Sequence, residues 1–157
     1  MITQYIKGDI VALFLNGKNI AHGCNCFHTM GSGVAGQLAK AYPRILEIDK
    51  TSTDYGFRGK LGDMSIVFKY SRGPSTCFNL YTQYEPGPNL DYHALVNCMV
   101  ELNRVLSEGT LFRPVVYIPR IGCGIAGGDW EKVSMLIDIF TPDIDLIVVD
   151  YEPSANS

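Results

Sequence analysis

The sequence predicts an α/β domain in which helices cover both faces of a mixed β-sheet. Strand-like and helix-like segments alternate along the chain. The last strand-like segment, "DLIVVD" at residues 145–150, is apolar enough to be buried on both faces of a sheet. Two glycine-rich stretches each lie between a strand-like and a helix-like segment. In α/β sheets, such loops beyond the strand ends are where ligands bind.

The length of 157 residues fits a single domain over residues 1–157, with a loose polar tail at about 152–157. No apolar run reaches the length of a membrane span, and the N-terminus lacks the pattern of a signal peptide. We therefore expect a cytoplasmic monomer that does not bind membranes.

Six segments favour strands because they are short, apolar and bounded by turn residues. They are residues 3–6, 19–25, 64–70, 76–82, 115–118 and 145–150. The third and fourth are joined by the turn "SRGPS". Residues 10–15 are apolar but ambiguous between strand and helix, and they end at the turn Asn16-Gly17.

Three apolar stripes at helical spacing predict helices. The stripes are Val34, Leu38 and Ala41, then Leu95, Met99, Leu102 and Leu106, then Val133, Leu136, Ile137 and Phe140. Pro43 either ends the first helix or opens a second one that continues through Ile48.

The cysteine count and the charge exclude several classes of protein. Five cysteines are an odd number, which favours reduced thiols in a cytosol. Cys24 and Cys26 have no second pair at metal-ligand spacing, so we expect neither a metal site nor a cofactor. The net charge is -3 with acids and bases mixed, which argues against general nucleic-acid binding. An anionic small molecule is still compatible, because backbone N–H groups can hold it.

The first glycine stretch is "MGSGVAGQ" at residues 30–37, and the second is "YIPRIGCGIAGGDW" at residues 117–130. In the second, four of the seven residues from Gly122 to Gly128 are glycine. One helix N-terminus contributes only about 0.3–1 kcal/mol to anion binding, whereas micromolar affinity requires about 8 kcal/mol. Two loops closing on one diphosphate are therefore the better hypothesis. The alternative is that the glycines serve tight turns and close packing.

A dinucleotide-binding dehydrogenase fits poorly. The G-x-G-x-x-G match at Gly31, Gly33 and Gly36 would require an acid at the end of the next strand, to hold a ribose. Asp49 and Asp54 lie near that distance, but their surroundings, "YPRILEIDKTST", favour a helix and a loop.

Three segments together resemble a macrodomain: "YIKGDI", "NIAHGCNCFHTMGSGVAGQLAKAYP" and "VVYIPRIGCGIAGGDWEKV". The resemblance covers about residues 3–151. It implies a three-layer α/β/α fold with a central mixed sheet and a cleft for ADP-ribose. "AHGCNC", followed by a glycine loop and "QLAKAYP", is similar to the branch of ADP-ribose-1''-phosphate phosphatases. That branch hydrolyses the 1''-phosphomonoester to ADP-ribose and phosphate. Because the sequence shows no dedicated Mg²⁺ cage, we expect turnover without a metal.

The resemblance also implies a role for individual residues. Asp9 would accept a hydrogen bond from the adenine amino group beside the Ile10 amide, Asn25 would contact the distal ribose, and Tyr151 would cover the adenine. The diphosphate and distal ribose would be wrapped by Gly31, Ser32, Gly33, Val34, Gly122, Cys123, Gly124 and Ile125.

His22 and Asp129 are the predicted catalytic residues. The resemblance places His22 where the phosphatase branch has its catalytic histidine, and histidine exchanges protons near neutral pH. From the residues alone, a core imidazole bonded to a neighbouring carbonyl is the favoured interpretation of His22, and only the resemblance reverses that preference. Asp129 would orient water or His22, and it could also be a helix N-cap.

Other functions remain compatible with the same residues. A related branch removes ADP-ribosyl groups with a lysine at the position that matches Gln83, and this departure argues against that route. An O-acetyl-ADP-ribose deacetylase, or a module that binds ADP-ribose without turnover, are further alternatives.

Overall fold

The computed structural model describes residues 1–153. Its strands are β1 (Ile2–Gly8), β2 (Ile20–Cys24), β3 (Met64–Lys69), β4 (Ser75–Tyr81), β5 (Val115–Ile118) and β6 (Asp145–Tyr151). Its helices are α1 (Ile10–Leu15), α2 (Gly33–Ala41), α3 (Arg44–Ser52), α4 (Tyr92–Ser107) and α5 (Trp130–Phe140), with a short 3-10 helix η1 (Arg58–Lys60). The alternation predicted from sequence is therefore present, whereas η1 was not predicted.

Within the described residues the strands form one six-stranded sheet in the order β1-β6-β5-β2-β4-β3. All neighbours pair in parallel except β3, which runs antiparallel to β4. The carboxyl ends of β1, β2, β4, β5 and β6 therefore meet at one edge of a mixed sheet. Because β3 is reversed, its first residue lies at that same edge.

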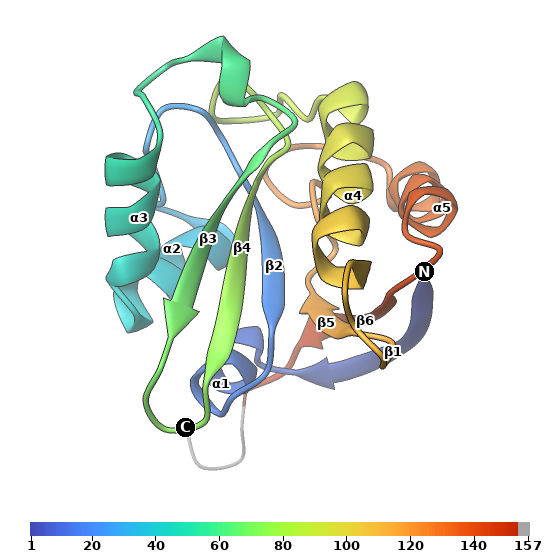
Figure 1. Ribbon diagram of the computed structural model, residues 1–157. Helices are drawn as coiled ribbons and strands as arrows, with labels where there is room; N and C mark the ends of the chain where they lie inside the picture. The colour runs from blue at the N-terminus through green and yellow to red at the C-terminus, as the bar shows by residue number, and fades with distance from the viewer. Residues whose placement is uncertain (154–157) are drawn as a thin grey trace.

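The sheet separates two hydrophobic cores, each covered by its own helices (Figure 1). Under α1, α2 and α3, the core is built from side chains that include Phe14, Ile20, Leu38, Ile45 and Tyr81. Under α4 and α5, it includes Ala21, Leu95, Met99, Val133 and Ile137. The neighbouring residues Ile20 and Ala21 enter different cores because side chains alternate along a strand.

Residues 10–15, which the sequence left ambiguous, form helix α1. Asp9 explains this outcome, because its Oδ1 accepts hydrogen bonds from the amides of Val11 (2.9 Å) and Ala12 (3.4 Å). Such an N-cap stabilises a helix start by about 1 kcal/mol. Pro43 lies between two separate helices, since α2 ends at Ala41 and α3 begins at Arg44. Both predicted roles of the proline therefore agree with the structure, although α3 continues beyond Ile48 to Ser52.

The predicted loose tail, at about 152–157, falls mostly outside the described residues. Glu152 and Pro153 are described, and the Glu152 amide donates a 2.8 Å hydrogen bond to the Gly8 carbonyl. Glu152 therefore continues the pairing of β6 with β1, and residues 154–157 of the predicted tail lie outside the described residues.

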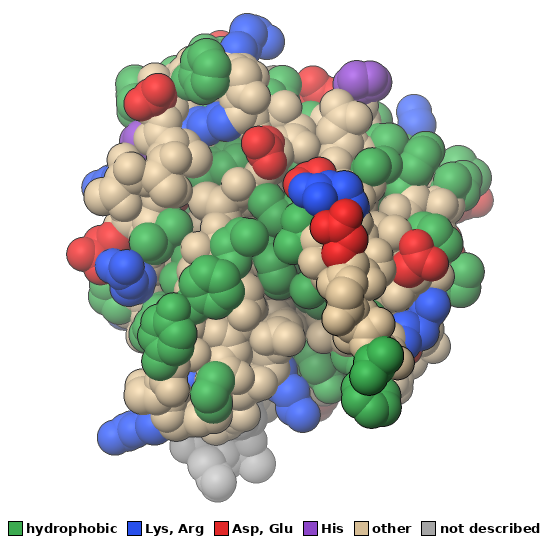
Figure 2. Space-filling view, viewed as in Figure 1, with side chains coloured by type: hydrophobic (Ala, Val, Ile, Leu, Met, Phe, Trp, Pro, Cys, Tyr) green, Lys and Arg blue, Asp and Glu red, His purple; other side chains and the backbone are tan. Residues whose placement is uncertain are grey.

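The surface mixes the two signs of charge. On the face shown in Figure 2, acidic and basic side chains are interspersed. One such group is Arg104, which pairs with Glu101 and Glu108 on the surface of α4. Among residues 1–153, no helix is long and apolar enough to cross a membrane.

Candidate functional site

The candidate site lies at the edge where the parallel strands end. Figure 1 shows the connections that follow β2, β4 and β5 gathered along the upper edge of the molecule. Ligands of α/β sheets bind outside the carboxyl ends of the strands. This edge therefore brings together most of the residues that the sequence predicted to bind a ligand.

In the first glycine loop, the glycines differ in what surrounds them. A Cβ built on Gly31 would have nothing within 4 Å, so this residue faces open space. A Cβ on Gly36 would lie 3.0 Å from the carbonyl carbon of Gly31, so Gly36 packs the start of α2 against the loop. Gly33 has φ +62°, a left-handed conformation that favours glycine. Ser32 and Gly33 are exposed beside Gly31.

In the second glycine loop, packing explains two of the glycines. A Cβ on Gly122 would lie 2.7 Å from Leu90 Cδ1, and one on Gly128 would lie 2.4 Å from Leu90 Cδ2. The Gly128 amide also donates a 2.7 Å hydrogen bond to the Gly122 carbonyl. Gly124, in contrast, has nothing within 4 Å of its Cβ position. The sequence did not identify Leu90 as the side chain that packs against Gly122 and Gly128 in this loop.

The two loops approach each other across the edge of the sheet. A Cβ on Gly33 would lie 3.9 Å from Ile125 Cδ1, in the second loop. Ile125 itself is 58% exposed. The structure therefore brings the two predicted diphosphate-binding segments together, with Gly31 and Gly124 presenting bare backbone to solvent.

At the β1 end of the edge, Asp9 lines a cavity of about 460 Å³ together with Gly8, Ala12 and Glu152. The Asp9 Oδ1 atom caps α1. Tyr151 is exposed and lies opposite Gly8 in the register of β1 and β6. Asp9 and Tyr151, which the resemblance predicts to contact the adenine, therefore lie close together beside this cavity, and their role stays a prediction.

Asn25 follows β2, and its side chain organises the loop that begins there. Its Nδ2 donates to the Thr29 side chain at 2.7 Å and to the Thr29 carbonyl at 3.2 Å, while its Oδ1 accepts from the Phe27 amide at 2.8 Å. A ribose would have to compete with these bonds. The predicted contact between Asn25 and the distal ribose stays a prediction.

Asp129 is exposed and lies at the end of the second loop, where it is the N-cap of α5. Its Oδ1 accepts from the Glu131 amide at 3.1 Å, and its own amide donates to the Tyr92 hydroxyl at 3.0 Å. The Lys132 ammonium lies 4.3 Å from the centre of the Tyr92 ring. Tyr92, which the sequence did not identify, therefore ties the end of the loop to α4.

His22 does not lie at the site. Its side chain is 1% exposed and points into the core under α3, whereas Asp129 caps a helix on the other face of the sheet. Burial lowers the pKa of His22 to about 4. The buried position of the imidazole counts against direct action of His22 on a substrate in solvent, and its catalytic role stays a prediction. The simpler reading of His22 as a core imidazole describes its position.

The hydrogen bonds of His22 have a fixed direction. Asn79 Oδ1 can only accept, so His22 Nε2 donates to it at 2.6 Å. Asn79 Nδ2 donates to Ser65 Oγ at 3.1 Å. The Tyr81 hydroxyl donates to Asp49 Oδ1 at 2.6 Å, so Ser65 must donate to Tyr81 at 2.8 Å. The five side chains form one hydrogen-bonded chain from β2 to α3, in which each donates to the next and Asp49 is the final acceptor. In order they are His22, Asn79, Ser65, Tyr81 and Asp49.

Two more side chains near the site are accounted for by local contacts. The Cys123 thiol lies 3.4 Å from the Ile121 carbonyl, and burial, assisted by Asp129, raises its pKa. It is therefore a thiol and not a ready nucleophile. Gln83 Nε2 donates to the carbonyls of Glu85 (2.8 Å) and Gly87 (2.9 Å), so it holds the turn that follows β4.

All five cysteines are free thiols. Within residues 1–153, no three His, Cys, Asp or Glu side chains lie close enough together to hold a metal ion. Between the two glycine loops, the chemistry that the structure can supply is therefore backbone N–H donors and the exposed carboxylate of Asp129 at the end of the second loop.

The fold and this edge define the class of protein: an α/β/α domain with a mixed sheet and two glycine loops that face each other beyond its strand ends. The chain belongs to the Macro domain family, whose family model matches residues 21–137. It is 57% identical over 154 residues to an uncharacterized 17.5 kDa protein of Enterobacteria phage T4, covering 98% of this chain and 99% of that protein.

Relatives with named activities are more distant. An ADP-ribose 1''-phosphate phosphatase of Lodderomyces elongisporus is 26% identical, covering 96% of this chain and all of that protein. A DNA ADP-ribosyl glycohydrolase of Mycobacterium bovis is 29% identical, with the chain spanning 44% of its length. The macrodomain of Mycobacterium tuberculosis DarG superposes with a TM-score of 0.75 at 27% identity, covering 98% of this chain and 99% of that one. The resemblance to macrodomains and the three-layer fold with a mixed sheet are confirmed.

Proposed function

We propose that this protein hydrolyses ADP-ribose-1''-phosphate to ADP-ribose and phosphate. The observation that carries the proposal is the pair of open glycines, Gly31 and Gly124, on two loops that face each other. The second of these loops ends at the exposed carboxylate of Asp129. Backbone amides without a Cβ can approach phosphate oxygens closely. Similarity to the phosphatase of Lodderomyces elongisporus supports the choice of substrate.

The proposed chemistry depends on Asp129 and not on His22. Asp129 accepts a proton from the water that attacks phosphorus, while the loop amides hold the phosphate oxygens. The bond between phosphorus and the 1'' oxygen breaks, and Asp129 returns the proton to that oxygen, so that the products are ADP-ribose and phosphate. One acid or base typically contributes about 10²–10⁴-fold to the rate. Positioning and N–H donors supply the remaining acceleration. Tyr92 fixes the Asp129 backbone, which limits where the carboxylate can point.

Removal of ADP-ribose from a macromolecule is the competing reaction. In the related branch a lysine takes part, but the side chain of Gln83 here is bound to two carbonyls of its own turn. This contact supports the phosphatase over a lysine-dependent glycohydrolase. A module that binds ADP-ribose without turnover would need the glycine loops but would not need the Asp129 carboxylate as a base.

The test is phosphate release from ADP-ribose-1''-phosphate, with and without EDTA, for the wild type and Asp129→Asn. Asparagine is as good an N-cap as aspartate, so this variant keeps α5 and removes the base. We expect at least about a 100-fold loss of turnover with ADP-ribose affinity retained. Asp91→Asn is the matched control, because Asp91 caps α4 through the Ala94 amide at 3.0 Å.

Three outcomes would contradict the proposal in different ways. Binding of ADP-ribose without phosphate release would make the protein a binding module or a glycohydrolase. Full activity of Asp129→Asn would reduce Asp129 to a helix cap. Loss of release in EDTA that returns with Mg²⁺ would show that a metal takes part.

A further inference from the structure

Two lysines are buried in this protein, and they differ in how their charge is satisfied. Lys69 is 4% exposed, and its ammonium donates to the carbonyls of Ser71 (2.6 Å), Arg72 (3.2 Å) and Gly73 (2.7 Å). An ammonium group carries three N–H donors. Lys69 therefore has an acceptor for each of them.

Lys60 is 6% exposed but is not satisfied in this way. Within residues 1–153, its ammonium donates one hydrogen bond, at 2.9 Å to Thr53 Oγ1. The Tyr81 ring lies 5.0 Å away and offers only a cation–π contact. Buried donors without acceptors are costly. The remaining N–H donors of Lys60 have no hydrogen-bond acceptor among these residues and are available to a molecule in the adjoining cavity.

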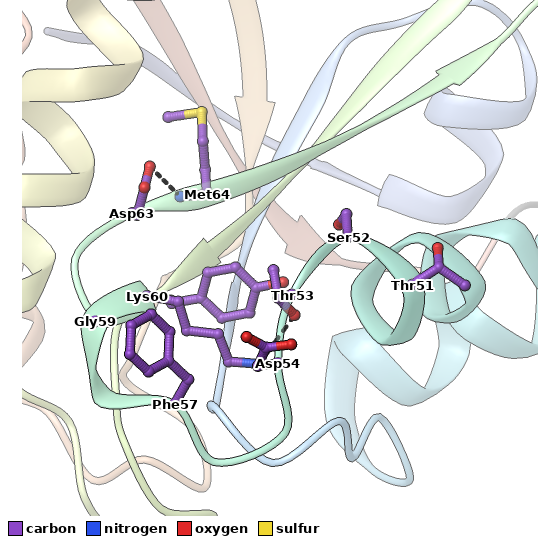
Figure 3. A pocket seen from close by; sticks show the side chains of 10 residues that line it. Thr51, Ser52, Thr53, Asp54, Phe57, Gly59, Lys60, Asp63 and Met64 are labelled. Carbon is purple, nitrogen blue, oxygen red and sulfur yellow. Dashed lines mark hydrogen bonds between the residues drawn. The ribbon is translucent and has the colours of Figure 1, made fainter.

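A cavity lies in front of this ammonium. It has a volume of about 310 Å³, is open to solvent, and is lined by the end of α3, by η1 and by the start of β3. Figure 3 shows the Lys60 side chain extending toward Thr53 and Asp54. Phe57 forms another wall and is 56% exposed. A Cβ on Gly59 would lie 2.3 Å from the Phe57 ring, so the absence of a side chain there leaves room for that ring.

The charges around the cavity indicate which ligand it fits. Asp54 and Asp63 line it beside Lys60, and the buried carboxylate of Asp49 lies behind, bound to the Tyr81 hydroxyl. An anion would meet more negative than positive charge. A hydroxyl group, in contrast, can accept from Lys60 and donate to Asp54. Carboxylates hold ribose hydroxyls in this way in dinucleotide sites.

We propose that this cavity binds a neutral polyhydroxyl compound about the size of a pentose. Its oxygens accept from the free Lys60 donors, its hydroxyls donate to Asp54, and its C–H face packs on Phe57. The cavity opens at the same edge of the sheet as the glycine loops, because β3 starts there. It is nevertheless a separate site, and the proposal does not depend on the reaction proposed above.

The test is a titration of ¹⁵N-labelled protein with D-ribose, in the presence of saturating ADP-ribose so that the glycine-loop site is occupied. We expect saturable amide shifts at Thr53, Gly59 and Met64. Inorganic phosphate at equal concentration should not produce them. Lys60→Met should abolish the D-ribose shifts, whereas Lys50→Met, an exposed lysine on α3, should retain them.

Asp54→Asn covers the case in which Lys60→Met fails to fold, because Asp54 is exposed. We expect this variant to bind D-ribose several-fold more weakly. Absence of saturable shifts would mean that water alone fills the cavity, and the proposal would be wrong. Shifts caused by phosphate instead of ribose, or ribose binding unchanged in Asp54→Asn and Lys60→Met, would also overturn it. Failure of ADP-ribose to bind would count against the proposed function only.

Discussion

The two glycine-rich loops look alike in sequence but use their glycines differently. In the second loop, Gly122 and Gly128 are bare because Leu90 occupies the space of their side chains. In the first loop, Gly36 is bare because the backbone of Gly31 lies against it. Each loop also has one glycine, Gly31 or Gly124, with nothing within 4 Å of its Cβ position. A glycine count therefore combines residues that build a loop with residues that leave room for a ligand.

The difference between packed and open glycines can be tested most directly at Gly128. A Cβ there would lie 2.4 Å from Leu90 and 2.6 Å from the Gly122 carbonyl oxygen, and backbone cannot move aside cheaply. We expect Gly128→Ala to lower the free energy of unfolding by roughly 3 kcal/mol. Urea unfolding measures this. Gly124→Ala is the control, with an expected change within about 0.5 kcal/mol. Equal losses in both variants would remove the distinction.

The strand that leads into the first loop offers a second test, through pH. His22 has a pKa of about 4 in the folded protein, against 6.5 ordinarily, because it is buried. Between these values the unfolded chain binds a proton that the folded protein does not, so stability falls as pH falls. The His22 contribution is about 3 kcal/mol across this window.

NMR of the His22 imidazole from pH 7 to pH 4 measures this directly. The ring should stay neutral until about pH 4, when the fold itself becomes less stable. Protonation near pH 6.5 would show that the ring reaches solvent, and would restore His22 as a candidate acid or base.

The open glycines should matter for binding and not for stability. We expect Gly31→Ala and Gly124→Ala each to weaken ADP-ribose binding about tenfold, or roughly 1.4 kcal/mol, because a methyl group keeps the phosphate from the amides. Calorimetry measures the affinity. Unchanged affinity in both variants would mean that the ligand does not lie between the loops.

The smallest effect is expected at Tyr92. Tyr92→Phe removes the acceptor of the Asp129 amide, which should cost about 1 kcal/mol of stability. Turnover should fall while ADP-ribose affinity stays constant, because only the carboxylate is displaced. Tyr5→Phe, on an exposed tyrosine of β1, serves as the control. A parallel loss of affinity would place Tyr92 in the binding surface instead.

The sequence predicted the alternation of strands and helices because periodicity and turn residues are local signals. It also predicted that both loops would meet at one edge, since parallel strands end together. From the residues alone, the sequence favoured a core position for His22. It could not show that α3 and Asn79 cover this face of β2, because both are distant from His22 in the chain. Leu90 and Tyr92 were missed for the same reason: their roles depend on contacts with residues more than thirty positions away.

The chain of donors from His22 to Asp49 has a consequence for how this core can vary. Each side chain fixes the direction of the next, so no member can be exchanged for one of opposite polarity without leaving a buried group unpaired. Asn79→Asp, for example, would present two acceptors where one donor is needed. In relatives that change one of these five residues, we therefore expect its hydrogen-bond partners to be substituted as well, so that the five residues vary together.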